Sequence, residues 1–431
     1  MRALLLTTAL LMAPLSALAH GGHKAPVVPP WQDASAWPDR VIVTLPESPQ
    51  TSFAVTWRTD SIVTETIAQI APATNDARFD LEAITVRANS EPLDPANPDI
   101  GGERFAAVWN TGLESAHFHS VVFRDLDPDT PYAYRVRGSK GAWSEWYQVQ
   151  TAAEDAPVEF VYVGDAQNGV LSHWSRLIRS AYQHAPEADF ILHAGDLVNR
   201  ASRDFEWAEW FKAVGFIHGM IPAIPVAGNH EYARLGLGAE QTDRILSIHW
   251  RPQFTLPEVE GLPEDLQEVV YDVRYSEDIH IFVLSTQNSN LRAQARWLDG
   301  ALRESDAKWK IVSMHHPVFS SGRGRDNQER REVLLPVLER HAVDLVLQGH
   351  DHTYARGVIA QTPERVSQST EEGRVKTMFV NSVSGPKMYN FKETEWDEYA
   401  DTGVDLVRKA ENTQFFQIIL DANDLEELRI F

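Results

Sequence analysis

The chain contains no cysteine among its 431 residues, so no disulfide stabilises it and it relies on its hydrophobic cores. Basic residues are also few, with 39 Lys and Arg against 61 Asp and Glu and a formal net charge of −22. Because such a field repels phosphate backbones, no nucleic-acid polymer is expected as a partner. A small anionic substrate would need local positive charge, which bound cations could supply.

Long apolar runs are absent beyond the first twenty residues, so no membrane span is expected in the mature chain. The opening stretch, MRALLLTTALLMAPLSALAH, predicts a signal peptide over residues 1–19 with cleavage after Ala19. An uncleaved anchor is the alternative. Export and the lack of cysteine together indicate a secreted or periplasmic protein. Residues 20–37, which begin with Gly, His and Pro, are predicted to form a flexible tail.

Residues 38–152 alternate between apolar and polar side chains over short stretches such as FAVTW and YAYRV. Turn signals, among them LDPDTP, separate these stretches. Short strands of period two with such punctuation predict a β-sandwich. The segment TAAEDAP, which follows them, is the expected linker to a second domain at residues 158–431.

From Val158 onward, short apolar runs alternate with helical patterns, which is typical of α/β architecture. Four groups of residues are predicted to lie on helix faces: Leu171, Trp174, Ile178 and Ala181; Trp207, Trp210, Phe211 and Val214; Leu291, Ala295, Leu298 and Leu302; and the stretch EVLLPVLERH. In the last of these, Pro336 is expected to mark a kink or a helix start.

Five of the apolar runs end in Asp, Asn or His, and four of these ends follow a glycine. The motifs are GDAQ from residue 164, GD from 195, GNHE from 228, HHP from 315 and GHDH from 349. Functional groups in open α/β sheets gather beyond the carboxyl ends of the strands, where glycine allows sharp turns. The sequence therefore predicts that these polar residues lie at one site.

The residue types at this site suit divalent metal ions. Carboxylates, carboxamide oxygens and neutral imidazoles are ligands for Zn, Mn or Fe. Two Asp, one Asn and three His exceed what one ion needs. A carboxylate shared between two ions, as in two-metal hydrolytic sites, would use them all.

The motifs GDAQ, GDLVN, GNHEY, MHHP and GHDHTYAR, in this order and spacing, resemble the calcineurin-like metallophosphoesterase superfamily. The region in front of them is similar to the fibronectin-type-III-like domain of purple acid phosphatases. The resemblance runs from about residue 38 to the C-terminus. It implies a four-layer catalytic domain, with two mixed sheets between helices, behind a fibronectin-III-like sandwich.

The resemblance also implies roles for individual residues. The implied metal ligands are Asp165 and His352 on the first ion, Asn229, His315 and His350 on the second, and Asp196 bridging both. His230 would contact the phosphate and protonate the leaving oxygen, with Glu231 as an orienting partner. His316, beside a ligand, is expected to neighbour the ligands or the substrate.

Two positions depart from the purple acid phosphatase pattern. The Tyr whose contact with iron gives those enzymes their colour is replaced by Asn199, and Gln167 replaces a Gly. Gln167 could bind the first metal or hydrogen-bond a ligand, and both alternatives stay open. The two cations are therefore expected to be divalent or mixed-valence Fe, Zn or Mn.

The function expected from the resemblance is hydrolysis of small phosphate monoesters, with metal-bound hydroxide attacking phosphorus and His230 as general acid. One alternative is a phosphodiesterase acting on nucleotides or glycerophosphodiesters. Another is a non-catalytic binding protein that uses the sandwich. Arg323, in a glycine-containing loop, and Tyr354 are candidate substrate-binding residues. The sequence leaves the oligomeric state, the natural substrate and the pH optimum open.

Overall fold

The computed structural model describes residues 32–93, 115–234, 244–287, 290–360, 376–422 and 427–431. The predicted signal peptide and the first part of the predicted tail lie outside the described residues. The remainder of that tail, residues 32–37, is bound to the sandwich rather than free. The carbonyls of Gln32, Ser35 and Ala36 accept hydrogen bonds from Arg58, Asp60 and Ser139, at 3.0, 2.8 and 2.8 Å respectively.

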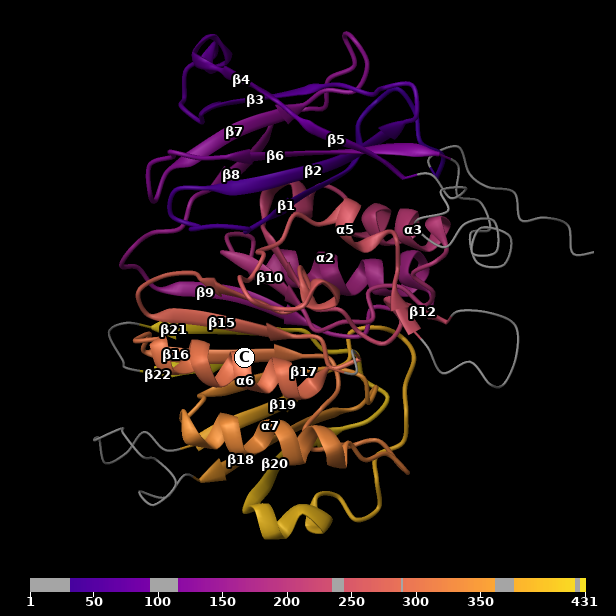
Figure 1. The fold of residues 1–431 in the computed structure, drawn as a ribbon, viewed down its shortest axis with the longest axis vertical. Coiled ribbons are helices and arrows are strands. Elements are labelled where there is room, and N and C mark those ends of the chain that lie inside the picture. The colour runs from indigo at the N-terminus through magenta and orange to yellow at the C-terminus, as the bar shows by residue number, and fades with distance from the viewer. Residues whose placement is uncertain (1–31, 94–114, 235–243, 288–289, 361–375, 423–426) are drawn as a thin grey trace, which may run out of the picture.

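The predicted β-sandwich is present at the N-terminal end of the described chain (Figure 1). Its strands are β1 (Asp39–Thr44), β2 (Phe53–Asp60), β3 (Ile67–Pro72), β4 (Ile84–Arg87), β5 (Asn89–Leu93), β6 (Ala116–Phe123), β7 (Pro131–Val136) and β8 (Tyr147–Gln150). A short 3-10 helix, η1 (Phe79–Glu82), precedes β4. One sheet has the order β4-β3-β7-β8, and β1-β2-β6-β5 face it. Trp57 and Tyr134 fill the core between the two sheets and are fully buried.

Strands β1 and β2 are buried on both faces, whereas their alternating sequence predicted one buried and one solvated face. The second face of this sheet packs against three helices of the second domain, namely α3 (Asp204–Val214), α4 (Ile217–Met220) and α5 (Trp250–Gln253). Polar side chains on that face are therefore buried at a domain contact instead of meeting water.

The first sheet of the second domain carries three of the five predicted strand ends. Its strands are β9 (Val158–Val163), β10 (Phe190–His193), β11 (Ala223–Pro225), β21 (Gln417–Ala422) and β22 (Glu427–Ile430). Strands β9, β10 and β11 are parallel neighbours. Strand β1 of the sandwich pairs with β11 through Thr44 and Ala223, so the sheet continues into the sandwich as β22-β21-β9-β10-β11-β1-β2-β6-β5.

The second sheet carries the other two predicted strand ends. Its order is β14-β15-β16-β17-β19-β18-β20, with parallel pairing from β15 to β19. The strands are β14 (Tyr271–Arg274), β15 (Ile279–Leu284), β16 (Trp309–Met314), β17 (Leu345–Gln348), β18 (Tyr354–Ala360), β19 (Lys376–Asn381) and β20 (Val404–Ala410). Both sheets of this domain are mixed, as the sequence predicted.

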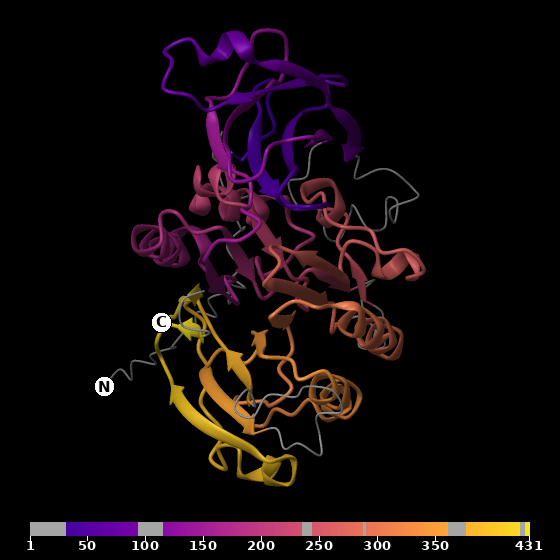
Figure 2. The ribbon, with the colours of Figure 1, turned by 90° about the vertical axis from the view of Figure 1, so that its left-hand side faces the viewer.

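The long helices cover the outer faces of the two sheets, which lie between them (Figures 1 and 2). These helices are the π-helical turn η3 (Val170–Trp174), α2 (Ser175–His184) and α3 on one side, and α6 (Leu291–Glu304) and α7 (Gln328–Arg340) on the other. The remaining elements are the hairpin strands β12 (Tyr232–Arg234) and β13 (Arg244–Leu246) and the 3-10 helices η4 (Glu264–Leu266) and η5 (Asp397–Thr402).

The predicted helix faces are buried as expected, with Trp174, Trp207 and Leu298 fully enclosed. Pro336 lies inside α7, which begins eight residues earlier at Gln328, so the prediction of a helix start there was wrong. No helix in the described ranges combines the length and apolarity needed to cross a membrane.

Candidate metal centre

The turns at the five strand ends place the predicted ligands in unusual backbone conformations. Asp165, Asp196, His350 and His352 all have positive φ angles, at 52°, 53°, 76° and 48°. A side chain in this left-handed region costs roughly 1 kcal/mol or more, and such residues cluster at functional sites. The turns thus hold these four side chains against a local backbone preference.

The structure brings all six predicted ligands together. Asp196, His315 and His350 form one group, and Asp165, Asp196 and His352 form another, with the candidate ligand atoms of each group within 4.8 Å of one another. The carboxamide Oδ1 of Asn229 lies 3.2 Å from Nε2 of His315, in the first of these groups. Asp196 belongs to both groups, which is the arrangement that a bridging carboxylate requires.

Backbone carbonyls orient the imidazole rings. Nδ1 of His315 donates to the carbonyl of Ala194, and Nδ1 of His352 donates to the carbonyl of Lys387, both at 2.8 Å. Because Nδ1 carries the proton in each ring, the Nε2 atom carries a lone pair and faces the carboxylates. Nε2 of His315 lies 3.2 Å from Oδ1 of Asp196, and Nε2 of His352 lies 3.5 Å from Oδ1 of Asp165.

These residues fit a pair of cations. Oδ1 of Asp165 is buried and has no hydrogen-bond partner among the described residues. Burial raises the pKa of Asp165 to about 8. Burial alone would lower the pKa of His315, but the adjacent Asp196 carboxylate raises it to about 9. The raised pKa values reflect carboxyl and imidazole groups crowded together in a dry site, and a cation bound between them would displace their protons and balance the charge of the carboxylates.

Gln167 lies between the two groups, but its amide nitrogen faces the ligands. Nε2 donates to Oδ2 of Asp196 at 2.5 Å and lies 3.3 Å from Nε2 of His352. Its Oε1 accepts from the side chain of Asn168 at 3.1 Å. This orientation matches the alternative in which Gln167 hydrogen-bonds a ligand.

Glu231 does not orient His230 as the sequence predicted. Its buried carboxylate accepts hydrogen bonds from the backbone N–H groups of Asp196, Leu197 and Gly228, at 2.8, 2.9 and 2.8 Å. The group that orients His230 is the backbone carbonyl of Asn199, which accepts from Nδ1 at 2.5 Å. The turn after β10 brings that carbonyl next to the His230 ring, whereas the Glu231 carboxylate faces the backbone N–H groups of the turn.

His230 is half-buried, as are Asn229 and His350, whereas the other predicted ligands are buried. Its backbone N–H donates to Oδ1 of Asp196 at 2.9 Å, and its Nε2 lies 3.8 Å from Oδ2 of the same carboxylate. His316 is buried, with Nδ1 within 2.9 Å of the Thr286 hydroxyl and its ring 4.1 Å from that of His350. His316 therefore packs against the ring of the candidate ligand His350.

A pocket of about 460 Å³ adjoins the metal centre. It is lined by Asn199, Arg200, Ala201, Ser202, Asn229, His230, Tyr232, Ala233 and Arg244. Arg244 on β13 contributes to the wall of this pocket. Neither Arg200, which directly follows the motif GDLVN, nor Arg244, which lies in none of the five motifs, was predicted as a site residue.

The two predicted substrate-binding residues make other contacts. The exposed Arg323 pairs with Glu393 at 3.4 Å. Tyr354 is buried at the start of β18 and stacks on Phe415, with ring centroids 4.5 Å apart. Arg325, two residues after Arg323, lies closer to the ligands because its guanidinium contacts the carbonyl of His350 at 3.3 Å.

Two ligand groups that share one aspartate, at the ends of strands from two mixed sheets, define a metal-dependent phosphoesterase domain. Residues 158–354 belong to the family described as calcineurin-like phosphoesterase, and residues 38–151 match the purple acid phosphatase N-terminal domain. The family implies bound metal ions and a phosphoester substrate.

Curated relatives are purple acid phosphatases and an acid phosphatase. The chain is 26% identical over 250 residues to "Purple acid phosphatase 21" of Arabidopsis thaliana, covering 56% of this chain and 54% of the relative. It is 24% identical over 349 residues to "Acid phosphatase type 7" of Homo sapiens, covering 75% and 71%. For "Purple acid phosphatase 21" and "Probable purple acid phosphatase 20", the match spans only 54% and 59% of the relative's length.

Solved structures share the fold. The purple acid phosphatase PPD1 from yellow lupin (Lupinus luteus) seeds superposes with a TM-score of 0.69 at 17% identity, covering 89% of this chain and 70% of that one. PhoD superposes with a TM-score of 0.58 at 13% identity, covering 90% and 85%. Both likenesses extend over the sandwich and the two mixed sheets together.

Proposed function

We propose that this chain hydrolyses small phosphate esters, monoesters in the first place, with two metal ions held by the residues around Asp196. The observation that carries the proposal is that Asp196 belongs to two ligand groups and that His230 lies between them and the pocket. Asp165, His352 and Asp196 would hold one ion, and Asp196, Asn229, His315 and His350 the other. Fe, Zn and Mn all suit this donor set.

When bound, the cations supply Lewis-acid charge for the phosphate oxygens and acidify water. The chain's own part is to position a proton. The Asn199 carbonyl accepts from Nδ1 of His230, so Nε2 is the ring atom that faces the pocket side of Asp196. A protonated Nε2 at this point can donate to the leaving oxygen of an ester whose phosphate lies at the metal centre.

The test is the substitution His230→Ala in metal-reconstituted protein. General acid catalysis is worth roughly 10²–10⁴-fold, so kcat on an alkyl phosphate should fall by that factor. The loss on p-nitrophenyl phosphate should be much smaller, since its leaving group departs without a proton. Metal content, measured by mass spectrometry, should stay at the wild-type level.

The matched control is His184→Ala, because His184 also has Nδ1 hydrogen-bonded to a backbone carbonyl, that of Ser180 at 2.7 Å, but lies at the exposed end of α2. Its activity should equal that of the wild type. Equal rates of the His230 variant and the wild type on the alkyl phosphate would remove His230 from the proposed role.

A phosphodiesterase is the second candidate, and Asn199 favours it. This residue lines the pocket at the position where purple acid phosphatases carry Tyr. A shorter side chain leaves room for a second ester group. Comparing kcat/KM for p-nitrophenyl phosphate with that for bis(p-nitrophenyl) phosphate distinguishes the two candidates.

We also propose that the protein is exported, to the periplasm or the medium. The support is the signal-peptide pattern of residues 1–19, which lie outside the described residues. Expression of the full chain should give a mature N-terminus at His20. A retained Met1 in the cytosolic fraction would contradict export.

A further inference from the structure

We infer that the pocket beside His230 binds a second anionic group on the alcohol part of the substrate. The class of substrate is a phosphate monoester whose alcohol also carries a carboxylate or a second phosphate. This inference rests on the proposed function, because it takes the reacting phosphate to lie at the metal centre. The inference concerns Arg200 and Arg244, two side chains that have no part in the proposed metal binding or proton transfer.

The charge of the pocket wall is the first observation. The described residues that line the pocket include two guanidinium groups and no carboxylate. The formal net charge of the chain is −22, so the positive sign of this concave surface is opposite to that of the chain as a whole. Two guanidinium groups at one opening attract anions, and each presents a planar set of donors that matches a carboxylate or phosphate.

The position of the pocket is the second observation. His230 lines it, and the proposed proton transfer from His230 goes to the leaving oxygen. The alcohol bonded to that oxygen must therefore extend into the same space. A volume of about 460 Å³ lies within the range of small-molecule sites. The second anion of the alcohol would then meet Arg200 and Arg244 rather than the metals.

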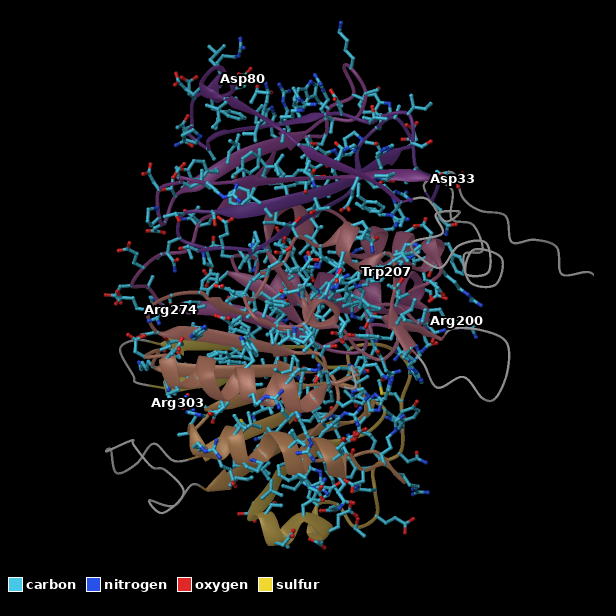
Figure 3. The ribbon with its side chains drawn as sticks, in the orientation of Figure 1. Asp33, Asp80, Arg200, Trp207, Arg274 and Arg303 are labelled. Carbon is cyan, nitrogen blue, oxygen red and sulfur yellow. The ribbon has the colours of Figure 1, made fainter. Side chains whose placement is uncertain are left out.

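Hydrogen bonds to the rest of the domain hold both arginine-bearing segments in place. The guanidinium of Arg244 donates to the carbonyl of Asn229 at 3.0 Å, which ties β13 to a predicted metal ligand. The Tyr232 and Ser285 hydroxyls, 2.7 Å apart, fasten β12 to the strand end after β15. The backbone N–H of Arg200 donates to Glu206 at 2.7 Å. The side chain of Arg200 is exposed, lines the pocket and lies at the edge of the molecule in Figure 3.

The experiment uses substrates that differ only at the second group. 3-Phosphoglycerate and glycerol 3-phosphate share the ester and the carbon skeleton, but the first has a carboxylate where the second has a hydroxymethyl group. Glycerol 1,3-bisphosphate keeps the same skeleton and its hydroxyl and supplies a second phosphate instead. The wild type, reconstituted with metal, should show kcat/KM at least tenfold higher for the doubly anionic substrates than for glycerol 3-phosphate. The preferred anion follows from comparing the two.

The variants Arg200→Gln and Arg244→Gln should each lower this ratio at least threefold, mainly through KM, and Arg244→Lys should restore part of it. Arg176→Gln on the exposed face of α2, away from the pocket, should keep the wild-type ratio. A wild-type ratio near one, or a ratio that neither substitution changes, would overturn the second-anion site. Failure to hydrolyse glycerol 3-phosphate and p-nitrophenyl phosphate at all would instead overturn the proposed function.

Discussion

The buried carboxylate of Glu231 supports the turns that carry the candidate ligands Asp196 and Asn229. Its three shortest hydrogen bonds come from backbone N–H groups of the two strand-end turns that follow β10 and β11. Burial first, and then the charge of Asp196, raise the pKa of Glu231, whereas the N–H groups of Gly228 and Asp196 oppose this rise by donating to the ionised carboxylate. Its hydrogen bonds fix the turn on which Asp196 sits, so the carboxylate shared by both ligand groups depends on it.

The substitution Glu231→Gln should weaken metal binding by about 10–100-fold, as is typical when a partner of a ligand is changed. Gln keeps one acceptor oxygen but turns an NH2 group toward at least one of the three N–H donors, and the clash displaces the turn. Titration with Zn or Mn, followed by calorimetry, measures the effect.

The control for this substitution is Asp189→Asn, at the opposite end of β10. Asp189 also accepts a backbone N–H, that of Glu159 at 2.8 Å, but lies before the strand rather than at the metal centre. It should leave metal affinity unchanged. Unaltered metal affinity in the Glu231 variant would mean that the turn at Asp196 keeps its conformation without the Glu231 hydrogen bonds.

The sequence was enough to predict which side chains gather at the candidate metal centre but not which groups support them, for a physical reason. Strand ends of a parallel sheet meet at one edge, so a repeated pattern of polar residues after apolar runs suffices to predict Asp165 or His350. The hydrogen-bond partners of Glu231 are backbone N–H groups, and their direction depends on the left-handed conformation of the turn. A local sequence pattern does not predict that direction. Arg244 reaches the pocket only because a hairpin folds back.

At the scale of the elements, the strand-end turns are packed so closely that glycine is required. A Cβ on Gly349 would lie 2.6 Å from Oδ2 of Asp165 and 2.9 Å from the carbonyl of Ala194. Neither neighbour can retreat, since Asp165 is buried at the metal centre and Ala194 accepts from His315. The glycine after β17 thus lets turns from the two sheets touch.

We expect Gly349→Ala to destabilise the fold by about 1–3 kcal/mol and to reduce metal content, because the added methyl group pushes the two turns apart. Urea unfolding and metal analysis measure both effects. Gly300→Ala is the control: it lies inside α6, where an added Cβ meets nothing within 4 Å. It should stabilise the protein by roughly 0.5–1 kcal/mol. An equal response of the two variants would contradict the packing argument.

The periodicity of the sequence predicted the buried face correctly for elements with one buried face. It was less successful for elements in which both faces are buried. Helices α2, α3 and α6 have their apolar residues at helical spacing, and their predicted faces are buried. In β2, Thr56 and Arg58 look like solvated positions, yet they are buried under helices that come more than a hundred residues later. The sequence pattern of a strand does not predict a packing partner that lies so far along the chain.

At the scale of the whole molecule, a buried ionic cluster joins the sandwich to the catalytic domain. Asp204, at the start of α3, pairs with Arg40 of β1 at 2.7 Å and with Arg58 of β2 at 3.1 Å. All three side chains are at most 5% exposed. The α3 helix that carries Asp204 follows the loop of Asn199 and Arg200, and Figure 3 shows its Trp207 beneath the sandwich. The sandwich therefore stabilises the position of α3, the helix that follows the pocket-lining loop.

The substitution Asp204→Ala should lower the free energy of unfolding by about 3–5 kcal/mol at pH 7, because it leaves two buried guanidinium groups without their shared counter-charge. Denaturation in urea, followed by tryptophan fluorescence, measures the loss. Glu65→Ala is the control, since Glu65 pairs with Arg87 at 2.7 Å on the surface, where both side chains are more than 70% exposed. Its effect should stay below about 1 kcal/mol.

The stabilisation by Asp204 has a definite pH dependence. Burial would raise the pKa of Asp204, but Arg40, His249 and Arg58 together lower it below its usual value. A carboxyl with a depressed folded pKa contributes its full stability above the pKa of the unfolded chain, about 3.9, and loses it as the pH falls toward the folded value. The difference in unfolding free energy between the wild type and Asp204→Ala should therefore be constant from pH 5 to 8 and shrink below about pH 4. A difference that grows on acidification would mean that Asp204 is not ionised in the folded protein, and the contact between the two domains would then owe nothing to its ion pairs with Arg40 and Arg58.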